Sequence, residues 1–464
     1  MTDTHQSHAP LPASHSTQRL AWGGWFWFTV AAISFILLAI WALVPWQWSS
    51  VDDPGQALAM RELIAANGFV GAIVERVGQL ALGDYEGGVF RPLAWIYPPL
   101  LYWMPVVPAH VVRLIMVMLI IIGPLVYFRR SGATPARLMV TLFILLIAAA
   151  SLYQGLILLS VQEVGGMALI SLGLLFRRST PRLIAWILAA WFKGPFVWIL
   201  FGYAFVLWRA GRKKLALTSG VVGLFTLAIN VWWSTSGTYT SRYQVNPLDP
   251  ELWNSASRLL EPFNGAILLA VLWWIVVTQT GPRIRHDFPI FAAAAVGYYV
   301  QMIPWGFTAY YMGPISFLMG LLLASLLSDP PGGLRLWRIL TALAVPLLLA
   351  AWILKGSITW VFQTNEILRQ ASQCLAEYPE SSTRVVGDWL YLTSSDEGPF
   401  RLGQNIQLLH PEWTGEIFLD TSVGHELRGP KTELVLVVDG AQYDLEDDAT
   451  VVCDQSLVKL MQLG

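Results

Sequence analysis

Two adjacent carboxylates, Asp52 and Asp53, follow shortly after the first long apolar segment of the chain, residues 24–45. A carboxylate beside lipid is costly, so ionisable residues at that boundary are by default functional candidates. A carboxylate within hydrogen-bond reach of a hydroxyl group can accept its proton while the oxygen forms a new bond. We therefore expect Asp53 first, and Asp52 second, to act as a general base. The structural alternative is a helix cap, since Asp favours helix starts and Pro54 suits a first helical position.

A set of basic residues lies on the side of the membrane to which we assign these carboxylates. If the group that leaves in the reaction is a phosphate, it gathers negative charge, and fixed cations in a poorly hydrated site would stabilise it. Lys193 alternatively extends its ammonium group to the outer interface, and the loop arginines are alternatively solvated. The candidate phosphate-binding residues are Lys193, Arg91, Arg242 and Arg258.

Four further polar residues are candidates for contacts to the substrates. Gln162 and Glu163 open an apolar segment, and a carboxylate such as Glu163 would stabilise an oxocarbenium-like transition state, by analogy with glycoside hydrolysis. Tyr97 and Tyr310 complete the set. Each of three residues also has a purely structural interpretation. Glu163 could form an ion pair across the bundle, Gln162 could bridge two helices by a hydrogen bond, and Tyr310 could belong to an aromatic belt at the membrane interface.

The elements that must position these residues are apolar helices. The chain has 464 residues, of which 55% are hydrophobic and 13% charged, which is typical of a polytopic membrane protein. Its long apolar runs do not alternate in polarity, so helices are expected rather than strands of a barrel. About eleven crossings are predicted, at residues 24–45, 110–127, 137–151, 158–176, 183–192, 195–208, 215–234, 259–279, 289–303, 307–327 and 338–355.

Basic residues at alternate ends of these segments predict the orientation. Fifteen of them share their turns with only two acids, Asp287 and Asp329, and the positive-inside rule places such turns in the cytoplasm. The amino terminus is then cytoplasmic, and Asp52 and Asp53 face the outside of a multi-pass inner (plasma) membrane protein. The fifteen are Arg19, Arg129, Arg130, Arg137, Arg177, Arg178, Arg182, Arg209, Arg212, Lys213, Lys214, Arg283, Arg285, Arg335 and Arg338.

Residues 183–208 are short for two crossings, yet both flanks are basic. A turn at Lys193-Gly194-Pro195 resolves this, because Gly and Pro interrupt a helix and an unpaired Lys is unfavourable in hydrocarbon. The first outer loop, residues 46–109, is predicted to contain a helical stretch at 56–66, a turn at Asn67-Gly68 and an aromatic interfacial segment at 93–103.

Three regions are predicted: a disordered cytoplasmic tail at 1–20, a transmembrane module at 21–356, and a small extracytoplasmic α/β domain at 357–464. The segment after Lys355 carries 17 acidic and 6 basic residues, unlike the rest of the chain. Its pattern predicts a helix at 365–378 and strands at 384–392, 416–420, 433–438 and 450–453. Both cysteines, Cys374 and Cys453, lie in it, and a disulfide is favoured over two free thiols or a metal site.

The sequence resembles the GT-C superfamily of polyprenyl-phosphate-dependent glycosyltransferases. The resemblance rests on the early acidic pair, the segment Tyr97-Pro98-Pro99-Leu100 and the Lys193-Gly194-Pro195 turn, and it covers roughly residues 20–330. The chain most resembles the polyprenol-phosphate-mannose-dependent α-mannosyltransferases of the phosphatidylinositol-mannoside type. The Asp52-Asp53 pair followed by Gln56-Ala57-Leu58 also resembles the aminoarabinose and protein-mannosyl branches.

This resemblance implies a polyprenyl-phosphate sugar donor, a hexose such as mannose, and a lipid, glycan or protein acceptor. It also implies that the sugar or the acceptor is bound by Gln162, Glu163, Tyr97 and Tyr310. No cofactor is expected, the metal requirement stays open, and membrane lipids but no nucleic acid are expected as partners. Two other function classes remain. A transporter or flippase would place ionisable residues near the midplane of several helices, and an envelope scaffold would bind a partner through the acidic C-terminal domain.

Overall fold

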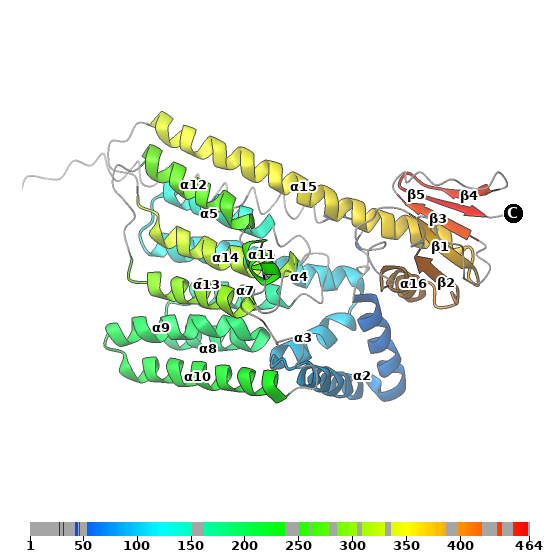
Figure 1. The fold of residues 1–464 in the computed structure, drawn as a ribbon, viewed down its shortest axis with the longest axis horizontal. Coiled ribbons are helices and arrows are strands. Elements are labelled where there is room, and N and C mark those ends of the chain that lie inside the picture. Colours follow the sequence, from blue (N-terminus) through cyan, green and yellow to red (C-terminus); the bar gives the residue numbers. More distant parts are fainter. Residues whose placement is uncertain are drawn as a thin grey trace, which may run out of the picture.

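The protein is a mostly helical molecule with a small C-terminal sheet, and Figure 1 shows the helices side by side along the long axis. The computed structural model describes residues 27, 31, 42–44, 46, 53–150, 162–236, 250–258, 261–277, 285–303, 309–329, 336–386, 397–419, 434–438 and 449–462. The predicted tail at 1–20 and most of the predicted segment 24–45 lie outside these residues.

A helix overlaps each predicted apolar segment after residue 109, and several extend beyond the predicted bounds. Each has a largely apolar sequence, which favours burial against a neighbouring helix or contact with lipid. Their bounds are α4 (Val106–Arg130), α5 (Pro135–Ala150), α7 (Glu163–Leu175), α8 (Ser179–Phe192), α9 (Trp198–Arg209), α10 (Lys213–Ser236), α12 (Glu261–Val277), α13 (Phe288–Met302), α14 (Ala309–Leu326) and α15 (Leu336–Ala376). A short helix, α11 (Pro250–Arg258), precedes α12.

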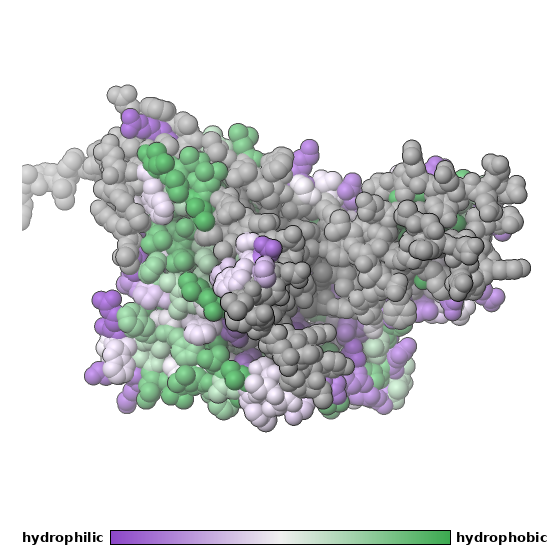
Figure 2. Space-filling view, viewed as in Figure 1, coloured by the Kyte–Doolittle hydropathy of each residue, from purple (hydrophilic) through white to green (hydrophobic). Residues whose placement is uncertain are grey.

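Three helical stretches of the described chain are long and apolar enough to cross a membrane: Gly55–Glu86, Val106–Arg130 and Lys213–Ser236. Figure 2 shows apolar residues gathered over the side of the bundle and hydrophilic residues toward its ends. Helix α10 exposes Leu217, Val221, Leu224 and Phe225, which recur at helical spacing. Large exposed apolar surfaces of this kind indicate contact with lipid, so the bundle associates with a membrane.

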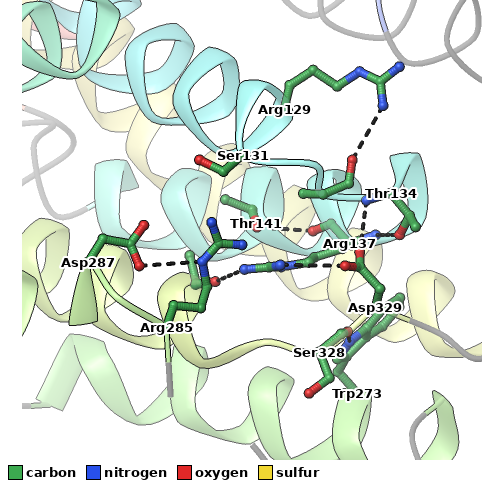
Figure 3. Close-up of polar contacts among 12 residues, drawn as sticks. Arg129, Ser131, Thr134, Arg137, Thr141, Trp273, Arg285, Asp287, Ser328 and Asp329 are labelled. Carbon is green, nitrogen blue, oxygen red and sulfur yellow. Dashed lines mark hydrogen bonds and ion pairs between the residues drawn. The ribbon is translucent and has the colours of Figure 1, made fainter. Parts of the chain in front are cut away.

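Those basic residues of the orientation set that the structure describes lie in or beside the turns at one end of the bundle, and two acids pair with some of them (Figure 3). Arg137 is buried, lies 3.7 Å from Asp329 and donates to the carbonyl of Ala324. Asp287 is also buried; it lies 3.3 Å from Arg285 and accepts a hydrogen bond from the Tyr127 hydroxyl at 2.9 Å. These contacts join the ends of α4, α5, α13 and α14.

The segment predicted as the first outer loop is more helical than expected, and its helix is one of those long and apolar enough to cross a membrane. One long helix, α2 (Asp53–Glu86), extends through the predicted stretch and turn, with a kink at Gly68, whose backbone has φ 69° and ψ 171°. A positive φ is readily adopted by glycine, so the turn predicted at Asn67-Gly68 exists as this kink. Helix α3 (Pro92–Tyr102) follows; it buries Tyr97 and Tyr102 and exposes Ile96 and Leu100. Both helices lie at the end of the bundle next to the C-terminal domain (Figure 1).

The predicted boundary at residue 356 lies inside a helix. Helix α15 continues without interruption from Leu336 to Ala376, so the helix predicted at 365–378 is its distal end. Leu368, Ala371 and Leu375 of that end are buried in the core of the C-terminal domain. The membrane-side bundle and the C-terminal domain therefore share one helix rather than a linker (Figure 1).

The C-terminal domain contains a five-stranded mixed sheet with the strand order β2-β1-β3-β5-β4. Helix α16 (Glu397–Leu409) connects the parallel strands β1 and β2, as a parallel pair requires a crossover connection. Strand β5 pairs antiparallel with β3 and β4. The strands are β1 (Ser382–Val386), β2 (Glu416–Leu419), β3 (Leu434–Val438), β4 (Thr450–Asp454) and β5 (Val458–Gln462). Sequence reasoning missed α16 and β5.

Cys374 of α15 and Cys453 of β4 form a disulfide, with their Cα atoms 5.7 Å apart and a separation of 79 positions in sequence. Cys374 is fully buried under the sheet. The bond therefore ties an edge strand to the helix that emerges from the bundle.

Removing this disulfide is expected to destabilise the C-terminal domain by about 4 kcal/mol, because a long loop of the unfolded chain is no longer closed. The measurement is thermal unfolding of the full-length Cys374→Ala/Cys453→Ala protein, in which unfolding of the domain is monitored by its loss of protease resistance. Wild-type protein treated with a reductant should behave like the double variant. An unchanged unfolding temperature in both would show that the bond contributes no stability.

The C-terminal domain also contacts the first outer loop directly. Leu408 of α16 is buried among residues of α2 and α3, and Arg61 of α2 donates a 2.7 Å hydrogen bond to its carbonyl oxygen. The domain therefore covers part of the loop that carries the predicted base.

Candidate functional site

Asp53 is the first residue of α2, and its side chain is fully buried. The Tyr102 hydroxyl, at the end of α3, donates a 2.5 Å hydrogen bond to its Oδ1 atom. An acid in the first turn is favoured by the helix dipole, so the position satisfies the helix-cap reading of the sequence as well. Complete burial of a carboxylate at this place is more than a cap requires, because a solvated Asp would serve the helix equally well.

A second tyrosine, Tyr97, lies near Asp53, and a cation lies beside that tyrosine. Arg113 of α4 is fully buried, with its guanidinium carbon 5.7 Å from the centre of the Tyr97 ring. Burial raises the pKa of the Tyr97 hydroxyl, with Arg113 lowering it and Asp53 raising it further through their charges. We call Asp53, Tyr97, Tyr102 and Arg113 the Asp53 cluster. Its members come from three different helices.

His110 lies one turn before Arg113 on α4 and is also buried. Its imidazole stacks on the indole of Trp46, with ring centres 4.3 Å apart. Trp46 packs in turn with Val361 of α15. The start of α4 therefore contributes two buried ionisable side chains to this end of the bundle.

Lys193 and Glu163 form a buried ion pair, with Nζ 2.7 Å from Oε1 and both side chains at most 5% exposed. The turn predicted at Lys193-Gly194-Pro195 is confirmed: α8 ends at Phe192, Lys193 is extended, and a short 3₁₀ helix covers Gly194–Val197. This extended residue lets the ammonium group reach the first turn of α7. Lys193 and Glu163 thus neutralise each other, which agrees with the structural interpretation of Glu163 as a member of an ion pair across the bundle.

Two glycines allow this approach. Gly165 and Gly166 follow Glu163 on α7 and face the rings of Phe192 and Phe196, which flank Lys193. A Cβ atom at Gly165 would lie 2.7 Å from the Phe192 ring, and one at Gly166 would overlap the Phe196 ring. Only a residue without a side chain fits at these two positions, so the sequence Glu163-Val164-Gly165-Gly166 builds the ion pair.

The Gly166→Ala protein is expected to unfold at a lower temperature, with a loss of about 1–3 kcal/mol from overpacking against Phe196. The measurement is thermal unfolding of the purified protein in detergent. Gly78→Ala is the matched control, because Gly78 is helical and no atom lies within 4 Å of the position that its Cβ would take. Equal unfolding temperatures for the two variants would contradict the proposed role of Gly166.

Arg91 is held by an acid and an amide. Its guanidinium donates two hydrogen bonds to Asp84, at 2.7 and 2.6 Å, and a third to the Gln162 side chain at 2.7 Å. The Trp95 indole also donates to Asp84 at 2.6 Å, and its ring stacks on Trp233 of α10. Gln162 thus bridges two segments by a hydrogen bond. Arg91 keeps 27% of its side chain exposed, whereas Lys193 is almost fully buried.

These groups form one continuous set of contacts. Tyr97 of the Asp53 cluster packs edge-on against Phe192, at 5.4 Å between ring centres, and Phe192 precedes Lys193. Glu163 follows Gln162, which contacts Arg91. Helix α2, helix α3 and the adjoining ends of α4, α7 and α8 therefore bring together the carboxylates of Asp53, Asp84 and Glu163 and the cations of Arg91, Arg113 and Lys193. Most of these groups are buried, and buried charge in a membrane-associated bundle is costly, so the cluster is the candidate functional site.

Several predicted residues lie outside the described side chains. Asp52 and Arg242 are outside the described residues altogether. Arg258 ends α11 and Tyr310 lies in the first turn of α14, but only their backbones are described. Among the residues that the structure describes, no group of three or more His, Cys, Asp or Glu side chains is placed to hold a metal ion.

Sequence reasoning missed Tyr102, His110, Arg113 and Asp84. One signal was present: Arg113 and His110 fall within the apolar run of α4, where ionisable residues are functional candidates by default. Nothing in the sequence indicated that Asp84 would hold Arg91, since their carboxylate and guanidinium groups meet only once α2 and α3 pack together.

A comparison of the chain with protein-family models, curated proteins and solved structures finds no match.

Proposed function

We propose that the chain is a membrane glycosyltransferase that moves a sugar from a polyprenyl-phosphate donor to a hydroxyl acceptor, with Asp53 as the general base. The observation that carries the proposal is the buried Asp53 cluster. It joins a carboxylate, a guanidinium and two tyrosines at the end of an apolar bundle. The resemblance of the first outer loop and of the Lys193 turn to the GT-C superfamily supplies the reaction class.

The step is a single displacement. The acceptor oxygen attacks the anomeric carbon of the sugar, the bond from that carbon to the donor phosphate breaks, and polyprenyl phosphate leaves with the bonding electrons. The acceptor proton passes to the Asp53 carboxylate, which is the role of a general base. One displacement inverts the configuration at the anomeric carbon. Tyr102 fixes Oδ1 of that carboxylate by its hydrogen bond.

The leaving phosphate needs cations that are already oriented before the reaction. Arg91 and Lys193 are each held by a carboxylate, Asp84 and Glu163, so neither has to be ordered when the donor binds. Arg91 is the more exposed of the two and is the first contact that we propose for the phosphate. Gln162, Tyr97, Arg242 and Arg258 remain proposed contacts to the donor or the acceptor.

The proposed topology follows from the basic turns. Eleven crossings with a cytoplasmic amino terminus place α2, α3 and the C-terminal domain outside the cytoplasm, in a cell inner membrane. A polyprenyl-linked sugar would then reach the site from the outer leaflet. The acceptor is a lipid, glycan or protein hydroxyl, and mannose is the first sugar to test.

The test is transfer of radiolabelled sugar in membranes that express the chain, compared with membranes that do not. Polyprenyl-phosphate mannose is supplied first, followed by other polyprenyl-phosphate sugars. Label that moves from the donor to another fraction only when the chain is present supports the proposed function. The absence of transfer with every such donor would favour a transporter or a scaffold.

A further inference from the structure

A second cluster of cations lies at the opposite, basic end of the bundle. It lines a cavity of about 480 Å³ between the end of α4, the end of α7, the start of α8 and the turn before α13. Three arginines and one histidine contribute to it: Arg130, Arg177, Arg182 and His286. Tyr127 and Ser131 add hydroxyl groups. The cavity plays no part in the proposed transfer reaction.

Two of the arginines are oriented by the end of α7. Arg182 donates to the carbonyl oxygens of Gly173 and Phe176, at 3.2 and 2.6 Å, and Arg130 donates to that of Leu175. The Arg182 guanidinium also lies over the rings of Tyr127 and Trp186. A guanidinium has five N–H donors, so these bonds hold both groups in place with donors remaining for a ligand.

The local charge balance is strongly positive. The lining of the cavity includes no acidic residue. The nearest acid in sequence, Asp287, is buried and is bonded to Arg285 and to the Tyr127 hydroxyl. Arg177 lines the cavity and is exposed, and no ion pair to it is found among the described residues. Oriented guanidinium groups with hydroxyl neighbours are suited to phosphate oxygens, which they bind with good geometry.

We propose that this cavity binds a phosphate group, carried either by the head group of an anionic lipid or by a soluble phosphate. Basic cavities between helices at the cytoplasmic side of membrane proteins hold anionic head groups by the same chemistry. The contact with Arg182 and Arg130 places the phosphate beside the last carbonyls of α7, where the arginines also offset the negative end of the helix dipole.

The test compares two adjacent arginines. Arg177 lines the cavity, whereas Arg178 is equally an exposed arginine but does not line it. Binding of phosphatidylglycerol is titrated in detergent with full-length wild type, Arg177→Gln and Arg178→Gln, and inorganic phosphate is titrated in a separate arm. Arg177→Gln is expected to weaken binding about fivefold, as the loss of one cation near a phosphate predicts, and Arg178→Gln is expected to leave it unchanged.

The two arms distinguish the sources. If Arg177→Gln weakens the binding of phosphatidylglycerol but not that of inorganic phosphate, the ligand is a lipid head group. If it weakens the binding of both, the cavity binds the phosphate group without the lipid. Equal weakening by both variants would show a general attraction to the basic surface and would overturn the proposal. Equal binding by all three proteins would overturn it as well.

Discussion

The Asp53→Asn protein is expected to lose sugar transfer by at least about 100-fold, the typical contribution of a general base. Asn has nearly the shape of Asp, but it cannot accept the acceptor proton in the transition state. The Tyr102 hydroxyl can still donate to the amide oxygen, so the contact between α2 and α3 is kept. The measurement is the initial rate of label transfer by purified protein, with thermal unfolding as a check of the fold.

The Tyr102→Phe protein is the companion variant. It keeps the carboxylate and removes the hydrogen bond that positions it, so transfer should fall by less than in Asp53→Asn. Asp52→Asn tests whether the adjacent carboxylate, the second candidate from the sequence, acts as the base instead. Full activity in Asp53→Asn would remove this residue as the base, and loss only in Asp52→Asn would transfer the role to its neighbour.

The Lys193→Met protein is expected to be destabilised by about 3–5 kcal/mol, because Glu163 is left as a buried charge without its partner. Neutralising both residues, as Glu163→Gln/Lys193→Met, should recover much of the loss, since the uncompensated charge is gone. Thermal unfolding of the two single variants and the double variant gives the coupling between the residues. Additive losses in the double variant would show that the pair is not coupled.

The partly exposed pair Glu366 and Arg369 on α15 provides a control. The hydrogen bond from Arg369 lowers the pKa of Glu366. The pair therefore stabilises the protein fully at pH values above the ordinary pKa of glutamate, and this stabilisation is lost as the pH falls through the lowered pKa. Because both side chains are about one-third exposed, Arg369→Met should cost at most about 1 kcal/mol. A loss as large as that of Lys193→Met would mean that burial does not set the cost of breaking these pairs.

The helices of the bundle were largely predictable because apolar length and Gly or Pro interruptions are local properties of the sequence. The turn at Lys193 is an example: a cation followed by Gly194 and Pro195 cannot continue an apolar helix unchanged, and the structure shows the break at this place. Helices α2 and α15 are longer than predicted because their full length is not set by local sequence alone. Gly68 kinks α2 without ending it, and the polar second half of α15 is held by packing in the C-terminal domain.

The partners of the charged residues were not predictable in the same way. Glu163 meets Lys193 because Gly165 and Gly166 let two helices approach closely, and Arg91 meets Gln162 across 71 positions of sequence. Such pairs depend on how helices pack, which a hydropathy pattern does not specify. The pattern did place Asp53, Glu163 and Lys193 on one side, and the structure brings them to one end of the bundle.

The most direct test of the central claim is a single reaction of purified wild-type protein with radiolabelled polyprenyl-phosphate mannose and total envelope lipids, glycans and proteins as acceptors. If the chain is a glycosyltransferase, label leaves the donor in an amount equal to the polyprenyl phosphate released, and it appears in an acceptor fraction. If this sugar is not used, another polyprenyl-phosphate sugar should give the same result. Donors that all remain intact in the presence of folded protein would contradict the account.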